Sequence, residues 1–157
     1  MKLKVRFLCE TGIIAALYAA LTLALAPISF GAVQVRVSEA LCVLPFFTPA
    51  GVPGLFLGCI ASNLLGSPLG PMDVIVGSAA TLIAALIASR VKKSWLVPLA
   101  SVLVNAFLVA FVLNVMLGLP YWLNVLYVGA GQAVACYALG MPLLYILSRN
   151  RKVLFSR

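Results

Sequence analysis

Residues 39–66 read EALCVLPFFTPAGVPGLFLGCIASNLLG, and this stretch decides how often the chain crosses a membrane. The apolar run is nearly continuous, but Pro45, Pro49 and Pro53 interrupt it. Proline disrupts the helical hydrogen-bond ladder. The stretch is therefore compatible either with one kinked helix or with two shorter helices that meet near residues 48–51.

The distribution of positive charge selects between these alternatives. Every Lys and Arg except Arg36 lies in three segments, residues 1–6, 90–93 and 149–157. Two helices within 39–66 place all three segments on one side of the membrane, whereas a single helix separates the first from the other two. Basic segments favour the cytoplasmic side. We therefore predict an all-α bundle of six transmembrane helices with both termini in the cytoplasm.

The predicted bundle is a single membrane domain, residues 1–157. Its spans cover approximately residues 8–26, 37–48, 51–66, 72–90, 95–117 and 121–147. Val33, Val35 and Val37 alternate with polar residues, which favours an extended connection before the second span; the alternative is that this connection forms the first turns of that span. Residues 1–32 can also be read as a cleaved signal peptide. We expect a retained first span, because the chain that follows is itself apolar.

The composition requires lipid as the solvent. Apolar residues make up 64% of the 157 residues, charged residues 9%, and the mean hydropathy is +1.18. Soluble domains have about a quarter of their residues charged. The net charge is +8, and the basic residues flank apolar runs. We therefore expect the chain to lie in a lipid bilayer and not to bind nucleic acid.

Polar residues gather at the predicted outer ends of the helices, while the inner halves are plainer. Polar groups are costly in hydrocarbon and often functional there. We expect an outward-opening pocket that binds substrate through nine side chains: Gln34, Arg36, Glu39, Asn63, Asp73, Trp122, Asn124, Tyr127 and Gln132.

Several of these residues have simpler explanations. Asp73 follows a turn and would suit a helix N-terminus, and Arg36 with Glu39 would suit a surface ion pair. Trp122 is typical of an interfacial belt, and Gln132 of an interhelical hydrogen bond.

The remaining features concern packing and chemistry. Small residues recur in the first span, and they permit close approach of another helix, either within this chain or in a partner. They are Ala15, Ala16, Ala19, Ala20 and Ala24.

The four cysteines fit small buried thiols, and we expect neither metal nor cofactor. With no histidine, no catalytic set and no phosphate-binding loop in the sequence, we expect no catalytic residues and no enzyme.

Three segments resemble the QueT family, the substrate-binding (S) components of energy-coupling factor (ECF) transporters assigned to queuosine precursors. They are QVRVSEALCVLPFF (34–47), GLFLGCIASNLLG (54–66) and DVIVGSAATL (73–82). The resemblance implies a six-helix S component of the bacterial cell membrane, which captures a 7-deazaguanine from outside. It also implies that the alanines of the first span dock an ECF transmembrane coupling protein, with two ATPase subunits completing the importer.

Other functions remain compatible with the sequence. The chain would also suit an S component for another small vitamin-like solute, or a stand-alone ion-coupled carrier. A membrane enzyme that uses Glu39 and Asp73 as an acid/base pair lacks any supporting catalytic set.

Overall fold

The computed structural model describes residues 2–30 and 35–151 of the chain. These residues form helices and turns, with no strand among them, which confirms the all-α prediction for this part of the chain. The helices, in order, are α1 (Lys2–Ala24), α2 (Ala26–Ser29), η1 (Val37–Phe46), α3 (Gly51–Gly66), η2 (Asp73–Gly77), α4 (Ser78–Arg90), η3 (Ser94–Leu96), α5 (Val97–Leu117), α6 (Tyr121–Ala133), η4 (Val134–Leu139) and α7 (Gly140–Arg149).

Four helical segments of the described chain are long and apolar enough to cross a membrane. They are Lys4–Ala24, Asp73–Arg90, Ser94–Leu117 and Tyr121–Arg149. The two helices between them, η1 and α3, are apolar but shorter. At about 2.0 Å per residue for a 3₁₀-helix and 1.5 Å for an α-helix, each is shorter than the roughly 30 Å hydrocarbon core. Helices thus occupy all six expected ranges, and the count of six spans stays a prediction.

Local sequence explains where the helices end. Leu25 interrupts α1 just before Pro27, and Thr48 accepts a hydrogen bond from the Ala50 backbone N–H at 3.3 Å, just before α3. Helix α5 ends at Gly118, whose φ of +66° is a left-handed conformation that glycine adopts without steric cost. The chain then enters α6 after Pro120.

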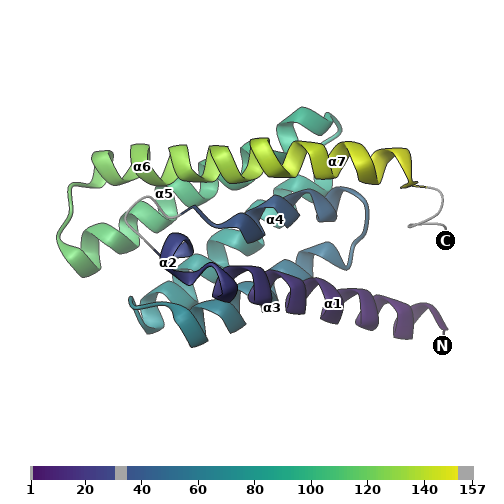
Figure 1. The fold of residues 1–157 in the computed structure, drawn as a ribbon, viewed down its shortest axis with the longest axis horizontal. Helices are drawn as coiled ribbons and strands as arrows, with labels where there is room; N and C mark the ends of the chain where they lie inside the picture. Colours follow the sequence, from purple (N-terminus) through teal and green to yellow (C-terminus); the bar gives the residue numbers. More distant parts are fainter. Residues whose placement is uncertain (1, 31–34, 152–157) are drawn as a thin grey trace.

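Helix η1 occupies the centre of the bundle. It is a 3₁₀-helix of 10 residues, although such helices seldom exceed four residues. Figure 1 shows it as the blue helix between α1 and the long rod formed by α6, η4 and α7, and it contacts α1, α3, α4, α5, η4 and α7. Around it, α1 packs on α3, α3 on α4, α4 on α5, and α5 on α6. Helix η1 is therefore surrounded by the other helices, and its side chains lie in the interior of the bundle.

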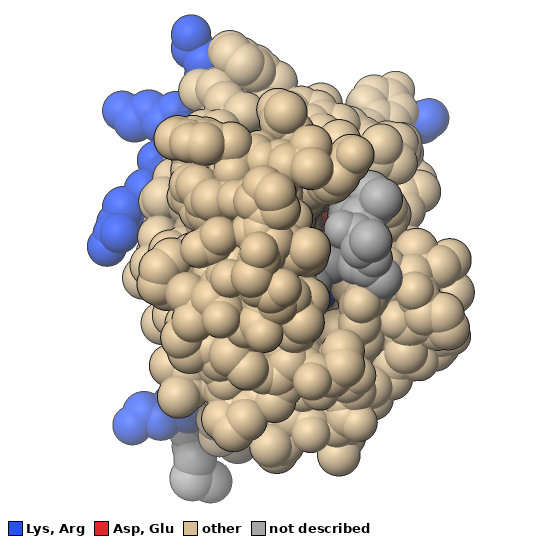
Figure 2. Space-filling view, turned by 90° about the vertical axis from the view of Figure 1, so that its left-hand side faces the viewer, with Lys and Arg blue, Asp and Glu red and all other residues tan. Residues whose placement is uncertain are grey.

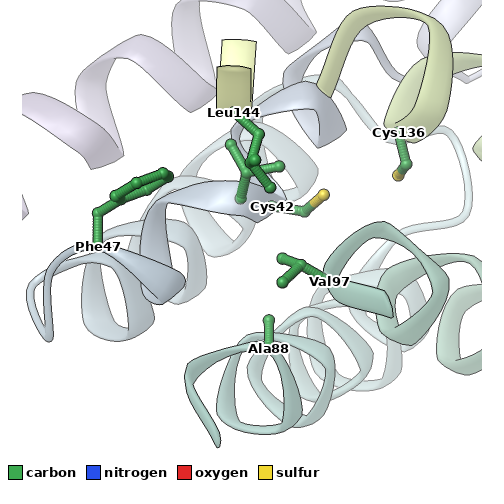
Figure 3. Packing of buried hydrophobic residues seen from close by; sticks show 7 residues of the cluster. Cys42, Phe47, Ala88, Val97, Cys136 and Leu144 are labelled. Atoms are coloured by element: carbon green, nitrogen blue, oxygen red, sulfur yellow. The ribbon is translucent and has the colours of Figure 1, made fainter. Parts of the chain in front are cut away.

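Apolar contacts hold the second half of η1 in place. Figure 3 shows Cys42 and Phe47 packed with Ala88 of α4, Val97 of α5 and Leu144 of α7. Cys59 and Cys136 are also buried, but Cys9 is exposed. The expectation of four buried thiols was therefore wrong for Cys9, which lies on the outer face of α1.

The two ends of the molecule differ in charge. The start of α1 and the end of α7 lie at the same end of the bundle in Figure 1. Figure 2 looks at the opposite end, and the basic side chains visible in that view lie at its outline. This arrangement agrees with the charge pattern of the sequence; which side of the membrane each end faces stays a prediction.

Candidate functional site

Two adjoining groups of polar side chains, buried except for the partly buried Ser67, surround the start of η1. The first, called here the Glu39 cluster, consists of Tyr18, Glu39, Ser101 and Asn105, each no more than 3% exposed. The second, the Asp73 cluster, consists of Arg36, Cys59, Asn63, Ser67 and Asp73. The backbone N–H of Glu39 donates to the Arg36 carbonyl at 3.0 Å, so one helical turn joins the two clusters.

In the Glu39 cluster, three side chains donate hydrogen bonds to one carboxylate. Tyr18 Oη donates to Glu39 Oε1 at 2.6 Å. Ser101 Oγ donates to Oε2 at 2.6 Å, and Asn105 Nδ2 donates to the same oxygen at 3.4 Å. Thr22 strengthens the link between α1 and η1, because its hydroxyl lies 2.6 Å from that of Ser38.

The Asp73 cluster contains a buried ion pair. Arg36 donates to Asp73 Oδ2 at 3.3 Å, and Ser67 Oγ donates to the same oxygen at 2.6 Å. Asn63 Nδ2 donates to the Asp73 carbonyl at 3.0 Å. A guanidinium is not deprotonated in proteins, because its pKa lies far above neutral pH. The guanidinium therefore stays charged.

The Asp73 cluster leaves buried polar atoms without a partner in the described chain. They are Arg36 Nε, Asn63 Oδ1 and Asp73 Oδ1. Most buried polar atoms are hydrogen-bonded, because an unpaired one costs about 1–3 kcal/mol. Two of the three are acceptors, so the cluster presents acceptors to a group that donates hydrogen bonds.

The backbone around Asp73 allows the side chains of Asn63 and Asp73 to pack against it closely. Residues Asp73–Gly77 form a π-helical turn, a feature frequent at functional sites. A Cβ added at Gly77 would lie 2.9 Å from both Asn63 Nδ2 and Asp73 Oδ1. Gly77 thus leaves room for these two side chains where any other residue would crowd them.

The structure brings together four of the nine predicted binding residues: Arg36, Glu39, Asn63 and Asp73. Arg36 is paired with Asp73 and both are buried, so the alternative of a surface ion pair between Arg36 and Glu39 is wrong. Asp73 does lie in the first turn of η2, as the capping alternative supposed, but the hydrogen bonds of its carboxylate are to the side chains of Arg36 and Ser67.

The other predicted binding residues belong to neither cluster, although Cys136 links Gln132 to Glu39. Gln132 is buried on α6 and accepts from Cys136 Sγ at 3.7 Å; the same thiol donates to the Glu39 carbonyl at 3.7 Å. Asn124 is buried, with its Nδ2 unpaired. Trp122 is 71% and Tyr127 48% exposed, so we leave both out of the candidate site. Gln34 lies outside the described residues.

The alanines of α1 do not share one face. Ala16, Ala20 and Ala24 are exposed, whereas Ala15 and Ala19 are partly buried. Ala15 faces α3, where a Cβ added at Gly58 would meet its carbonyl oxygen at 2.8 Å. The small-residue pattern therefore serves an internal contact on one side and leaves a small-residue surface on the other.

Sequence reasoning missed Tyr18, Ser101, Asn105 and Ser67. The expectation of plain inner halves was wrong, because Ser101 and Asn105 lie in the first half of α5 and reach Glu39. Their spacing of four residues in an apolar helix places them on one face, and this signal was available. Cys59, read as a plain buried thiol, accepts hydrogen bonds from Asn63 and Thr81.

This arrangement is suited to binding a polar ligand. It offers carboxylate and amide acceptors inside an apolar bundle, and no group of three His, Cys, Asp or Glu side chains among the described residues is placed to hold a metal ion. Apolar helices long enough to cross a membrane, arranged around a buried polar site, are typical of membrane proteins that handle polar solutes.

Comparisons with known proteins identify the family. The family model described as the QueT transporter matches residues 8–149, and the chain belongs to this family. The Queuosine precursor transporter QueT of Lactococcus lactis subsp. cremoris (strain MG1363) is 42% identical over 73 residues. That match covers 45% of this chain and 42% of the relative, so it spans less than half of the relative's length. No solved structure gives a significant match.

Family membership confirms the resemblance seen in the sequence. The family model is described as a transporter, which agrees with the prediction of a membrane transport protein and not an enzyme.

Proposed function

We propose that this chain is the substrate-binding subunit of an ECF importer in a bacterial cell membrane, and that it captures a queuosine precursor from outside. Membership of the QueT family supports the transport role. The name of the Lactococcus relative, a queuosine precursor transporter, supports the substrate class. The chain crosses the membrane six times in this proposal, with both termini in the cytoplasm.

The unpaired acceptors of the Asp73 cluster carry the proposal. A 7-deazaguanine presents a ring N–H and an amino group side by side, as a guanidine-like donor edge. Asn63 Oδ1 and Asp73 Oδ1 are buried acceptors with no partner in the described chain, on neighbouring side chains. Such an edge would satisfy both, and each bond that a wrong ligand fails to make costs about 1–3 kcal/mol.

The remaining subunits supply the energy. The sequence contains no G-x-x-x-x-G-K-[ST] phosphate loop, so ATP hydrolysis by that route belongs to other chains. In this proposal a transmembrane coupling protein docks on the exposed face of α1 that includes Ala16, Ala20 and Ala24, since small side chains permit close approach of another helix. Two ATPase subunits complete the importer.

Calorimetric titration of the purified chain with a 7-deazaguanine tests the substrate. We expect binding by the unaltered protein and affinity reduced at least about fivefold in Asp73→Asn, which replaces one carboxylate oxygen by an amide donor. Glu10→Gln is the matched control, because Glu10 lies outside both clusters and contacts Arg6 and Thr48. The proposal fails if the unaltered protein does not bind, or if Asp73→Asn binds equally well.

A further inference from the structure

The charges buried around η1 do not balance. Among the described residues, three charged side chains are buried: Arg36, Glu39 and Asp73. They comprise one cation and two carboxylates, and these carboxylates are two of the only three acidic residues in the chain. With all three ionised, the interior of a chain that is otherwise strongly basic carries one excess negative charge.

Glu39 is the carboxylate without a counter-ion. Arg36 lies 3.3 Å from Asp73, and no ion pair joins a described residue to Glu39. The partners of Glu39 are the neutral donors Tyr18, Ser101 and Asn105.

The geometry around Glu39 fits an ionised acceptor. An ionised carboxylate only accepts hydrogen bonds, and both hydroxyl donors lie at 2.6 Å. Distances of about 2.5–2.7 Å are typical of a hydroxyl that donates to a charged oxygen. A carboxylate has about four acceptor positions. Three donors therefore leave one position open.

An isolated carboxylate in an apolar interior is unfavourable, and neutral donors lessen this cost without removing the charge. We propose that the missing cation belongs to the substrate, so that the chain selects a 7-deazaguanine bearing a protonated amine over a neutral one. This inference rests on the proposed function. Glu39 binds the amine, while Asn63 and Asp73 of the adjoining Asp73 cluster bind the donor edge of the base.

Two bases that share the donor edge and differ in charge test this selection. They are 7-aminomethyl-7-deazaguanine, a cation near neutral pH, and the uncharged 7-cyano-7-deazaguanine. We expect the unaltered protein to bind the amine about 30-fold more tightly, the scale of a buried charge pair. In Glu39→Gln this preference should fall close to one through loss of amine affinity, with binding of the cyano compound retained.

Asp73→Asn is the matched control, because it alters the edge that both bases share and should weaken both by a similar factor. Equal affinity of the unaltered protein for the two bases, or an equal loss of both in Glu39→Gln, overturns the inference while leaving the proposed function intact. Binding of neither base by the unaltered protein overturns both proposals.

A second variant keeps the test decisive if Glu39→Gln does not fold. Ser101→Ala keeps the carboxylate but removes one of its short hydrogen bonds. It should weaken binding of the amine more than binding of the cyano compound. Equal weakening of the two would overturn the inference.

Discussion

At the scale of single residues, Gly77 allows the side chains of Asn63 and Asp73 to pack closely against the backbone. A methyl group at this position would lie 2.9 Å from Asp73 Oδ1 and from Asn63 Nδ2, closer than side chains normally approach. We expect Gly77→Ala to displace both side chains and to weaken ligand binding at least about tenfold, more than it changes the melting temperature. Calorimetry and thermal unfolding of the same preparation measure the two effects.

Gly129→Ala is the control for this change. It also places a methyl group on a membrane helix, but its nearest neighbour, Ala106 Cβ, is 3.5 Å away at ordinary contact distance. Ligand affinity should stay within about twofold of the unaltered protein. If both variants bind equally well, the space beside Asp73 is not where the ligand lies.

The sequence predicted part of this site for a definite reason. Arg36, Glu39 and Asp73 are ionisable residues in or beside apolar segments, and burial of such residues is costly enough to single them out. Their partners were harder to find, because serine and asparagine occur in membrane helices for packing alone. Which carboxylate pairs with Arg36 depends on tertiary contacts between segments 37 residues apart, which no local pattern specifies.

At the scale of elements, two glycines of α3 determine how closely α1 approaches. A Cβ added at Gly54 would lie 2.7 Å from Ile14 Cβ, and one at Gly58 would lie 2.7 Å from Tyr18 Cβ. We expect Gly58→Ala to separate the helices, to lower stability by about 1–3 kcal/mol, and to displace Tyr18 from Glu39. Thermal unfolding in detergent measures the loss of stability.

Gly12→Ala in α1 is the matched substitution, since nothing lies within 4 Å of the added Cβ. It should change stability by no more than about 0.5 kcal/mol. A loss of the same size in both variants would show that the cost arises from glycine replacement itself and not from the contact between α1 and α3.

Hydropathy identified where the helices lie but not how they wind. The ranges around residues 51–66 and 95–117 correspond closely to α3 and to η3 with α5. The 3₁₀ winding of η1 and the π turns at Asp73–Gly77 and Val134–Leu139 depend on packing, because apolar residues are equally compatible with all three helix types. These irregular segments include Glu39 and Asp73. The sequence therefore predicted which residues belong to the candidate site, but not how their side chains are arranged.

At the scale of the whole molecule, the proposed function assigns binding of the solute to this chain and energy-driven transport to its partner subunits. In liposomes that contain the chain alone, we expect no accumulation of radiolabelled 7-deazaguanine. Accumulation should require ATP together with the coupling protein and its ATPases. ATP-independent accumulation by the chain alone would identify it instead as an ion-coupled carrier.

Substitutions on the exposed face of α1 can distinguish an effect on docking of the coupling protein from an effect on solute binding. Ala16→Leu combined with Ala20→Leu changes only exposed side chains on this outer surface. Bulky side chains would hinder close approach of a partner helix. Uptake by the complete importer should then fall at least about tenfold while calorimetric affinity stays unchanged. Leu126→Ala on the exposed face of α6 should leave both unchanged; an equal loss of uptake there would place docking elsewhere on the bundle.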